Sequence, residues 1–355
     1  SVILIGAIIG SIIGGIIADR VGRKKTLILT SLLFCIGPFT LVFADDFSEL
    51  IIGRILSGFG VGIASIVVPL YISEMSESSY RGALVSMNQL AIVTGMLSAY
   101  IINFAFANSG NYKAMFACGF LPAFVLFFGM LFIPDTPSFL ASKSKFAKAK
   151  KVLRKIGRNK KDEEAFLKNH KNKRKSVSLK TLFSPSVIKS LIIGIGLCVF
   201  QQITGINTVF YYAPKIFKIA GFQTAGGAIF ATVGLGIVNL IMTIVAMILL
   251  DRSGRRKLLV IGISGMIISL FILGFSFLFD PKDTGIVSVI SLMGYVAFFA
   301  MSLGPIAWLM ISEIFPLGIR GRAMGIATFS NWLCNYIVSV SFLYLVKYFT
   351  IGGTF

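Results

Sequence analysis

The residues of this chain that are best suited to chemistry are side-chain amides inside long apolar runs. An amide carries hydrogen-bond donors and an acceptor together, which suits a neutral polyhydroxyl ligand. These amides are Gln89, Gln201, Gln202, Asn207, Asn239, Asn331 and Asn335. Trp308, near the end of one run, adds an aromatic plane that could cover the apolar face of such a ligand. Because Arg54 is the one clear charge within the runs, a neutral polar substrate is favoured over an ionic one.

The alternative for any single amide is a hydrogen bond that joins neighbouring helices, and the spacing of the amides bears on this choice. Asn331 and Asn335 are four residues apart, so they share one face of a helix. Gln202 and Asn207 are five apart, which places them about 140° apart around a straight helix. Both can face one cavity only if the helix unwinds between them, and Gly205 permits that. Broken helices are expected around transporter sites.

The apolar runs that carry these residues predict an all-α membrane protein. The chain is 56% hydrophobic and only 14% charged, whereas a soluble domain carries about 25% charged residues. A run of about 20 apolar residues is long enough to cross a bilayer as a helix. The ten predicted spans are 1–17, 26–44, 50–72, 82–105, 114–133, 187–212, 225–250, 258–279, 286–311 and 323–346. The first has no basic flank before it and no small-residue cleavage site after it, so a signal peptide is not expected.

The net charge of +20 would suit a nucleic-acid partner, but the distribution of the charge indicates membrane topology instead. Segment 141–183 carries sixteen Lys and Arg residues against three acids, and two short loops near residues 20–25 and 252–257 are also basic. All of these loops fall on one side of the predicted spans, which the positive-inside rule assigns to the cytoplasm. We therefore expect a multi-pass protein of the plasma or bacterial inner membrane, embedded in lipid, with loop 134–186 cytoplasmic and no nucleic-acid partner.

Two charged phrases occur twice and in the same order, which indicates two homologous halves. "DRVGRK" begins at Asp19 and "DRSGRR" at Asp251, while "EMSESSYRG" begins at Glu74 and "EIFPLGIRG" at Glu313. Parallel halves joined by a cytoplasmic loop are a known transporter plan, with the site between the halves. We predict a half at 1–133, a basic helical linker at 134–186 and a half at 187–355. One span fewer precedes the first phrase than the second, so a plan of six and six spans, without its first and twelfth, is expected.

The repeated phrases also predict a latch at the cytoplasmic ends of the spans. Gly22 and Gly254 permit tight turns, and arginines can pair with Glu74 and Glu313 at the ends of other spans. Pairs that form in one conformation and break in another would make a two-state element. The predicted latch residues are Asp19, Arg20, Gly22, Arg23, Glu74, Arg81, Asp251, Arg252, Gly254, Arg255, Glu313 and Arg320. The alternative is that these charges only anchor the helix ends at the interface.

Several longer motifs resemble the sugar porter family of the major facilitator superfamily, including its bacterial sugar–proton symporters and facilitative glucose transporters. The motifs are "GGIIADRVGRKK", "GRILSGFGVGIASIVVPLYISE", "YRGALVSMNQLAIVTG", "PDTPSFL", "QQITGINTVFYYAP", "DRSGRRK" and "GPIAWLMISEIFP". They cover essentially the whole chain in order. The charged phrase is specific only to the superfamily, whereas "QQITGIN" and "PDTP" are far more specific to sugar porters. The resemblance implies the major facilitator fold, with two parallel pseudo-symmetric halves.

The resemblance also implies roles for particular residues. Sugar porters unwind the span around Gly205 and bind sugar with residues that match the seven amides and Trp308. Tyr211 and Tyr212 match the outer gate of the family, although tyrosines near a span end are also common interfacial residues. "NW" at Asn331–Trp332 resembles the facilitators, whereas "FFAMSLGPIAW" is closer to the bacterial symporters and has Ala300 where the facilitators have an acid. The choice between hexose and pentose therefore stays open.

The expected function is secondary transport of a monosaccharide by alternating access, coupled to protons. Arg54 is the candidate coupling residue. In proton-coupled relatives its partner is an acid on the family's first span, which is expected to be missing from the ten spans predicted here. A structural ion pair or snorkelling to the interface is the alternative. A facilitative uniporter, a carrier of another polyol such as inositol, and a sugar sensor that does not transport are the alternatives. No nucleophile–base pair, metal-ligand spacing or phosphate loop occurs in the sequence, so no enzyme activity and no cofactor are expected. We expect a monomer.

Overall fold

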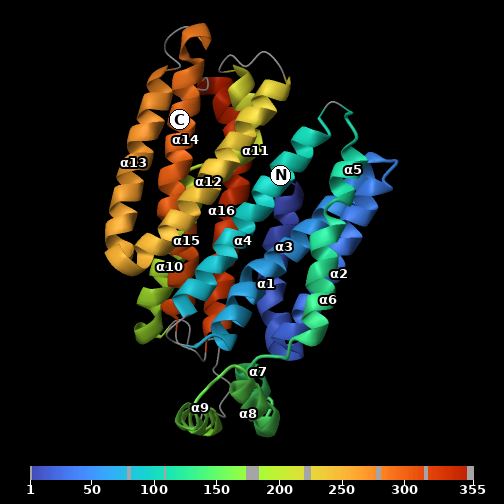
Figure 1. Ribbon diagram of the computed structural model, residues 1–355, viewed down its shortest axis with the longest axis vertical. Helices are drawn as coiled ribbons and strands as arrows, with labels where there is room; N and C mark the ends of the chain where they lie inside the picture. Colours follow the sequence, from blue (N-terminus) through green and yellow to red (C-terminus); the bar gives the residue numbers. More distant parts are fainter. Residues whose placement is uncertain are drawn as a thin grey trace.

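The structure is a computed structural model that describes residues 2–77, 81–107, 109–172, 184–219, 225–276, 281–315 and 319–349. All regular secondary structure in these ranges is helical. Ten helical segments within them are long and apolar enough to cross a membrane, as the sequence predicts. They form two helical halves side by side, with a small helical unit at the cytoplasmic end (Figure 1).

The first half contains five of these spans. They are α1 (Val2–Val21), α2 (Arg23–Val42), α3 (Phe47–Met75), α4 (Arg81–Ala105) and the pair α5 (Tyr112–Ala117) and α6 (Phe120–Phe132), which together make one span. Glycines let α1 and α3 pack with their backbones in contact. A Cβ atom on Gly58 would lie 1.9 Å from the Ile3 carbonyl oxygen, and one on Gly62 would lie 2.2 Å from the Ala7 carbonyl oxygen. Small residues allow this close approach of membrane helices.

The second half contains the other five spans, and two of them are broken. The broken spans are α10 (Pro185–Ile203) with α11 (Ile206–Ile219), and α14 (Pro281–Met301) with α15 (Leu303–Glu313). The others are α12 (Ala225–Ser253), α13 (Arg255–Ser276) and α16 (Arg320–Phe349).

The break between α10 and α11 lies where the sequence predicts unwinding. Gly205 adopts a φ of 79°, a left-handed conformation that favours glycine. The second break, at Ser302, was not predicted, since 286–311 was expected to be one continuous span. Pro305 supplies a physical reason, because its ring would clash with the carbonyl of Met301 in an unbroken helix.

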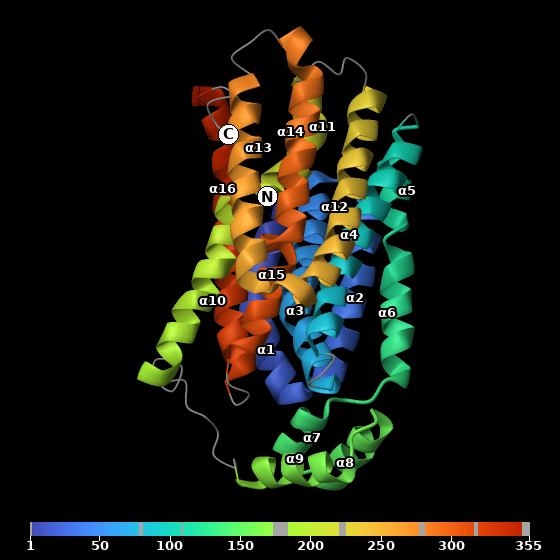
Figure 2. The same ribbon diagram turned by 60° about the vertical axis from the view of Figure 1, so that its left-hand side comes forward.

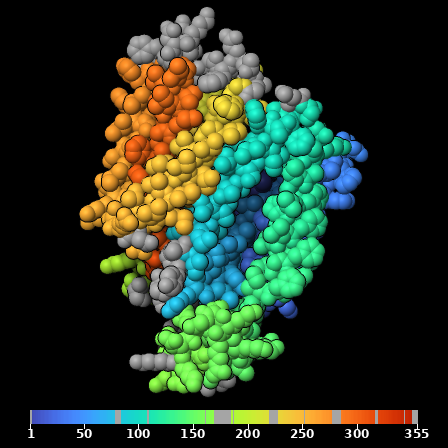
Figure 3. Space-filling view, in the orientation of Figure 1, coloured from blue at the N-terminus to red at the C-terminus, as the bar shows by residue number. Residues whose placement is uncertain are grey.

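The two halves meet along two seams, α1 against α16 and α4 against α12, and Figure 3 shows α4 and α12 in direct contact. Near the cytoplasmic end, Val85 of α4 packs with Leu250 of α12 and Ile306 of α15 in one apolar cluster. A Cβ atom on Gly15 of α1 would lie 3.6 Å from the Gly321 carbonyl oxygen of α16. The halves are therefore closed against each other on the cytoplasmic side.

The linker forms three short helices beneath the first half, seen at the bottom of Figure 2. They are α7 (Pro137–Ser142), α8 (Phe146–Lys155) and α9 (Lys160–Asn172). Helix α8 buries Ala149, Val152 and Leu153, whose spacing places them on one face of the helix. Glu163 of α9 is buried and pairs with Arg154 of α8 at 3.1 Å, so a charge pair helps to join two of the helices.

Candidate substrate-binding site

A cavity of about 370 Å³ lies between the two halves. Its volume falls at the lower end of the range of about 300–1,000 Å³ that is usual for small-ligand pockets. Helices α2, α3 and α4 of the first half line one side, and α10, α11, α12, α14, α15 and α16 of the second half line the other. The predicted substrate residues that line it are Gln89, Gln201, Gln202, Asn207, Asn239, Trp308 and Asn331. The break at Gly205 lets Gln202 and Asn207 both reach this cavity.

The second half presents an amide network to the cavity. Asn331 donates from Nδ2 to Gln201 Oε1 at 2.9 Å and to the Cys198 carbonyl at 3.0 Å. Gln202 donates from Nε2 to Asn331 Oδ1 at 3.2 Å, and Asn207 donates from Nδ2 to Gln202 Oε1 at 2.7 Å. Gln201, Gln202 and Asn331 are all buried. The amides therefore hold one another in place across α10, α11 and α16, and a bound ligand would have to extend or replace these hydrogen bonds.

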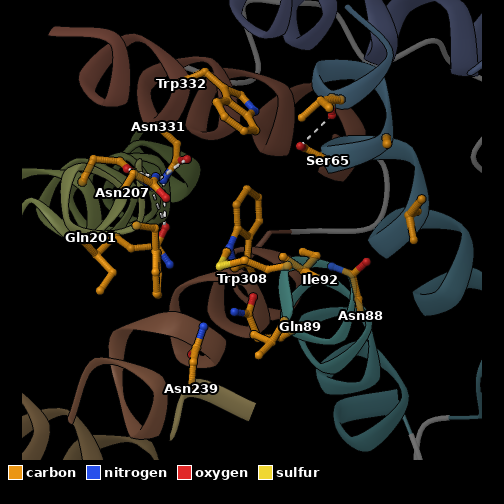
Figure 4. A pocket seen from close by; sticks show the side chains of 18 of the residues that line it. Ser65, Asn88, Gln89, Ile92, Gln201, Asn207, Asn239, Trp308, Asn331 and Trp332 are labelled. Atoms are coloured by element: carbon orange, nitrogen blue, oxygen red, sulfur yellow. Dashed lines mark hydrogen bonds between the residues drawn. The ribbon is translucent and has the colours of Figure 1, made fainter. Parts of the chain in front are cut away.

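The amides on the rest of the cavity wall form fewer hydrogen bonds with the protein. Figure 4 shows Trp308 in the middle of the view, with Gln89 and Asn239 on one side of it and Trp332 on the other. Neither Gln89 nor Asn239 forms a side-chain hydrogen bond with another described residue. Their amides therefore face the cavity with donors and acceptors available, one from α4 and one from α12.

Some lining residues were missed by the sequence analysis, among them Ser65, Asn88 and Trp332. Asn88 precedes Gln89 in the sequence, and Trp332 follows Asn331. Their position next to predicted residues is the sequence feature that could have identified them. The Trp332 indole N–H is buried and has no hydrogen-bond partner in the described part of the chain. An unpaired donor beside a cavity suits a ligand with hydroxyl acceptors.

Asn335 lies one helical turn from Asn331 but does not line the cavity. Its Nδ2 lies 3.5 Å from the hydroxyl oxygen of Tyr211, and its Oδ1 accepts from Ser339 at 3.1 Å. Tyr211 itself is 49% exposed, whereas the ring of Tyr212 stacks on Phe342 with centroids 5.3 Å apart. The structure thus places Asn335 with the predicted outer gate rather than with the substrate residues.

The predicted latch residues of the first half converge on Arg23. Its Nη2 lies 3.1 Å from both Asp19 Oδ1 and Glu74 Oε1. The side chains of Arg23 and Glu74 are only 11% and 8% exposed, so this pair is shielded from water. Gly22, with a φ of 107°, makes the turn that brings Arg23 back toward α3. Arg20 is exposed.

The segment "PDTPSFL" completes this cluster, although the sequence analysis assigned it no role in the latch. Asp135 Oδ1 accepts from the backbone N–H groups of Arg23 at 3.1 Å and Lys24 at 3.3 Å, which caps the start of α2. Thr136 donates its hydroxyl to Glu74, and Tyr71 donates to the Pro134 carbonyl at 2.7 Å. The segment therefore ties the start of α2 to the end of α3.

The latch residues of the second half are more loosely held. Arg255 Nη2 lies 3.1 and 3.2 Å from the two carboxylate oxygens of Glu313, but the two side chains are 48% and 33% exposed. Gly254 makes the corresponding turn, with a φ of 78°. Arg320 is buried and donates from Nε to the Phe315 carbonyl at 3.1 Å, while Arg252 is exposed. The side chains of Arg81 and Asp251 lie outside the described part of the structure.

Arg54 lies near the start of α3 with its side chain exposed. Its guanidinium sits over the ring of Phe116, 4.9 Å from the centroid, which is a favourable cation–π arrangement. No acid among the described residues lies within ion-pairing distance of it. The described residues also contain no group of three His, Cys, Asp or Glu side chains that could hold a metal ion.

Two parallel helical halves, a cavity with several amides at their seam and two broken spans beside that cavity define a membrane transporter of the major facilitator fold. The chain belongs to the family described as "Sugar (and other) transporter", which matches residues 1–355. It is therefore a multi-pass membrane transporter and not an enzyme.

Individual relatives agree with this family. The D-xylose transporter of Levilactobacillus brevis is 41% identical, over all of this chain and 79% of that protein. The arabinose-proton symporter of Bacillus subtilis is 38% identical, over all of this chain and 78% of that protein. The solved structure of the proton:xylose symporter XylE bound to 6-bromo-6-deoxy-D-glucose gives a TM-score of 0.88 at 36% identity, over 99% of this chain and 80% of that one.

An inward-open structure of the xylose transporter XylE from E. coli gives a lower TM-score of 0.76 at 35% identity, over 96% of this chain and 77% of that one. The arrangement of the halves here is therefore closer to the ligand-bound structure. This agrees with the cytoplasmic contact between Gly15 and Gly321.

Proposed function

We propose that this protein carries a monosaccharide across the cell membrane together with a proton, by alternating access. The observation that carries the proposal is the set of amides and indole rings around one cavity between the two halves. Amides donate and accept at once, as sugar hydroxyls do, and no charged side chain lines the cavity among the described residues. The names of the xylose and arabinose relatives support a pentose as the substrate, and the glucose derivative bound to the xylose symporter supports a hexose.

Binding couples to movement because the ligand would touch both halves. Gln89 belongs to the first half, and Asn207, Asn239 and Trp308 belong to the second. A sugar that bonds to both sides stabilises the arrangement in which the halves close around it, so it shifts the population toward that state. Release to either side then requires one seam to open while the other stays closed.

The two charged clusters stabilise the cytoplasmic ends of the halves during this movement. Arg23–Glu74 and Arg255–Glu313 each join helices of one half, so they do not bridge the seam directly. Asp19 is the member that faces the other half, because its carboxylate lies beside Gly321 in the first turn of α16. A negative charge at a helix N-terminus is favourable, so this contact favours the closed cytoplasmic state.

Arg54 is the residue that we assign to proton coupling. It is the one clear charge inside the apolar length of the spans, and a permanent cation there favours the ionised form of any acid that approaches it. Protonation of such an acid would release the cation. Arg54→Gln is expected to abolish the accumulation of sugar against its concentration gradient. Exchange of sugar across the membrane at equal concentrations on both sides is expected to remain.

The decisive experiment measures sugar uptake by the purified protein in proteoliposomes. Labelled xylose, glucose and galactose are supplied with and without an inward proton gradient. Accumulation above equilibrium that collapses with an uncoupler supports proton-coupled sugar transport. Uptake that only equilibrates would establish a facilitator instead. If the folded protein neither binds nor takes up any of these sugars, a monosaccharide is excluded as the substrate. That result would favour a carrier of another polyol or a sugar sensor.

A further inference from the structure

The two broken spans of the second half hold each other at their breaks. Tyr295 of α14 donates its hydroxyl to the Thr204 carbonyl, at the break between α10 and α11, with 2.6 Å between the oxygens. Gln201 of α10 donates from Nε2 to the carbonyls of Leu303 at 2.9 Å and Gly304 at 3.3 Å, just beyond the break between α14 and α15. Each span therefore supplies a side chain that binds the backbone of the other span at its break.

The first of these bonds meets a specific need of the broken helix. A helix that ends leaves carbonyl groups without intrahelical N–H partners, and in a membrane interior these groups must be satisfied within the protein. The backbone N–H of Gly205 turns back to the Gln202 carbonyl at 3.0 Å, and that of Val209 bonds to the Gly205 carbonyl at 3.1 Å. Among the described residues, no backbone N–H donates to the Thr204 carbonyl between them. Tyr295 supplies the donor.

The bonds from Gln201 are buried, and the bond from Tyr295 is partly buried with its donor side chain fully enclosed. Tyr295 has no exposed surface and packs in one cluster with Ile206 and Val209 of α11. Gln201 is 3% exposed. Hydrogen bonds that water cannot reach are stronger, and losing one partner costs more, than at a surface.

The braced backbone carries the substrate residues. Gln202 precedes Thr204 by two residues and Asn207 follows it by three, while Trp308 follows Leu303 by five. The Oε1 atom of Gln201 also accepts from Asn331 at 2.9 Å, which links the brace to the amide network of the cavity. A shift at either break therefore moves side chains on two walls of the same cavity.

We propose that Tyr295 is a positioning residue of the substrate site, and that Tyr295 and Gln201 form a cross-brace that makes the two breaks move as one unit. Helix α11 carries the predicted outer-gate tyrosines and α15 carries Trp308, so the brace transmits movement of the gate to the cavity wall. The effect on sugar binding rests on the proposed transport function, whereas the coupling of the two breaks does not.

The coupling is tested by hydrogen–deuterium exchange of the purified protein without sugar. Tyr295→Phe removes the hydroxyl and keeps the ring, so the cluster around it stays packed. Faster exchange is expected at residues 204–209 and also at residues 302–308, which the removed bond does not touch. Gln201→Met tests the brace from the other side and is expected to raise exchange in the same two segments. Tyr344→Phe, on the exposed surface of α16, is the matched control and is expected to change neither.

Faster exchange confined to 204–209 in Tyr295→Phe, or no change in either segment in both variants, would overturn the cross-brace. Sugar binding supplies a second readout, because the chain has two tryptophans and both line the cavity. Tryptophan fluorescence titrated with xylose should show affinity weakened about three- to tenfold by Tyr295→Phe, with unchanged affinity in Tyr344→Phe. If the unsubstituted protein binds no sugar, the proposed function fails. The exchange experiment still decides whether the two breaks move as one unit.

Discussion

Asn331 is the side chain that joins α16 to the amide network of α10. It donates to Gln201 and to the Cys198 carbonyl, and it accepts from Gln202, so its loss leaves three buried polar groups without that partner. Asn335, on the same helix and one turn away, contacts Tyr211 and Ser339 instead. The pair therefore separates a residue that lines the cavity from a residue beside Tyr211, which is a predicted gate residue.

Asn331→Ala is expected to weaken sugar affinity about tenfold or more, because unpaired buried polar groups each cost about 1–3 kcal/mol. Asn335→Ala is expected to change affinity less than about threefold and to act mainly on the transport rate. Fluorescence titration measures affinity, and initial uptake rates measure transport. Equal losses of affinity in the two variants would contradict the separation of the site from the gate.

At the scale of elements, capping and close packing position the helix ends and the helix axes. Asp135 caps α2 from a segment more than a hundred residues away in sequence, and it lies so close to Gly22 that a Cβ atom there would meet its carboxylate at 2.2 Å. Glycines on α3 let α1 approach it to backbone contact. The first half is therefore held together by two features that side chains of ordinary size would disrupt.

Asp135→Ala removes both hydrogen bonds to the start of α2 and is expected to cost about 1 kcal/mol of stability. Thermal unfolding of the detergent-solubilised protein should show a lower midpoint. Asp45→Ala is the control, because the Asp45 side chain is 91% exposed in a loop at the opposite end of α2, and it should leave the midpoint unchanged. The same midpoint in both variants would show that the cap does not stabilise the protein.

Gly62→Ala is expected to destabilise the first half by about 1–3 kcal/mol, because the new methyl group would overlap the Ala7 carbonyl at 2.2 Å. Gly95→Ala on α4 is the matched control, since a Cβ atom there meets nothing within 4 Å. Alanine favours a helix more than glycine does, so Gly95→Ala should be neutral or slightly stabilising. A stable Gly62→Ala protein would mean that α1 and α3 can separate without cost.

At the scale of the whole molecule, the halves also touch on the side away from the linker. Tyr100 of α4 donates its hydroxyl to the Phe210 carbonyl of α11 at 3.3 Å. A Cβ atom on Gly236 of α12 would lie 3.0 Å from the Tyr100 ring and 3.1 Å from Leu97. Opening the cavity toward the outside must break this hydrogen bond, because it joins the two halves.

Tyr100→Phe is therefore expected to shift the population toward the outward-open state by a factor of about two to ten, the equivalent of one ordinary hydrogen bond. The variant Ser65→Cys places a thiol in the cavity wall. The rate at which a membrane-impermeant reagent modifies this thiol from outside measures the population of the outward-open state. The four native cysteines are first replaced by serine. Tyr344→Phe in the same background controls for loss of a tyrosine hydroxyl, and an unchanged rate in Tyr100→Phe would contradict the outer contact.

Much of the site was predictable because its signals are local. Gly205 between Gln202 and Asn207 predicted a broken helix, since five residues place two side chains on different faces of a straight helix. The apolar runs predicted the ten spans, because a bilayer requires about 20 apolar residues for each. The break at Ser302 was missed because the prediction relied on the apolar character of 286–311. Apolar character shows that a segment can span the membrane, but it does not show where the helix is interrupted.

The sequence by itself determined the number of spans, the two related halves, the cytoplasmic side and the amides that line the cavity. Each of these depends on composition, on spacing along one helix or on charge in a loop. Only the tertiary structure decided that Asn335 contacts Tyr211, that Asp135 caps α2 and that Tyr295 binds the Thr204 carbonyl. These are contacts between segments far apart in the chain, and they depend on the rotation and depth at which helices pack against one another.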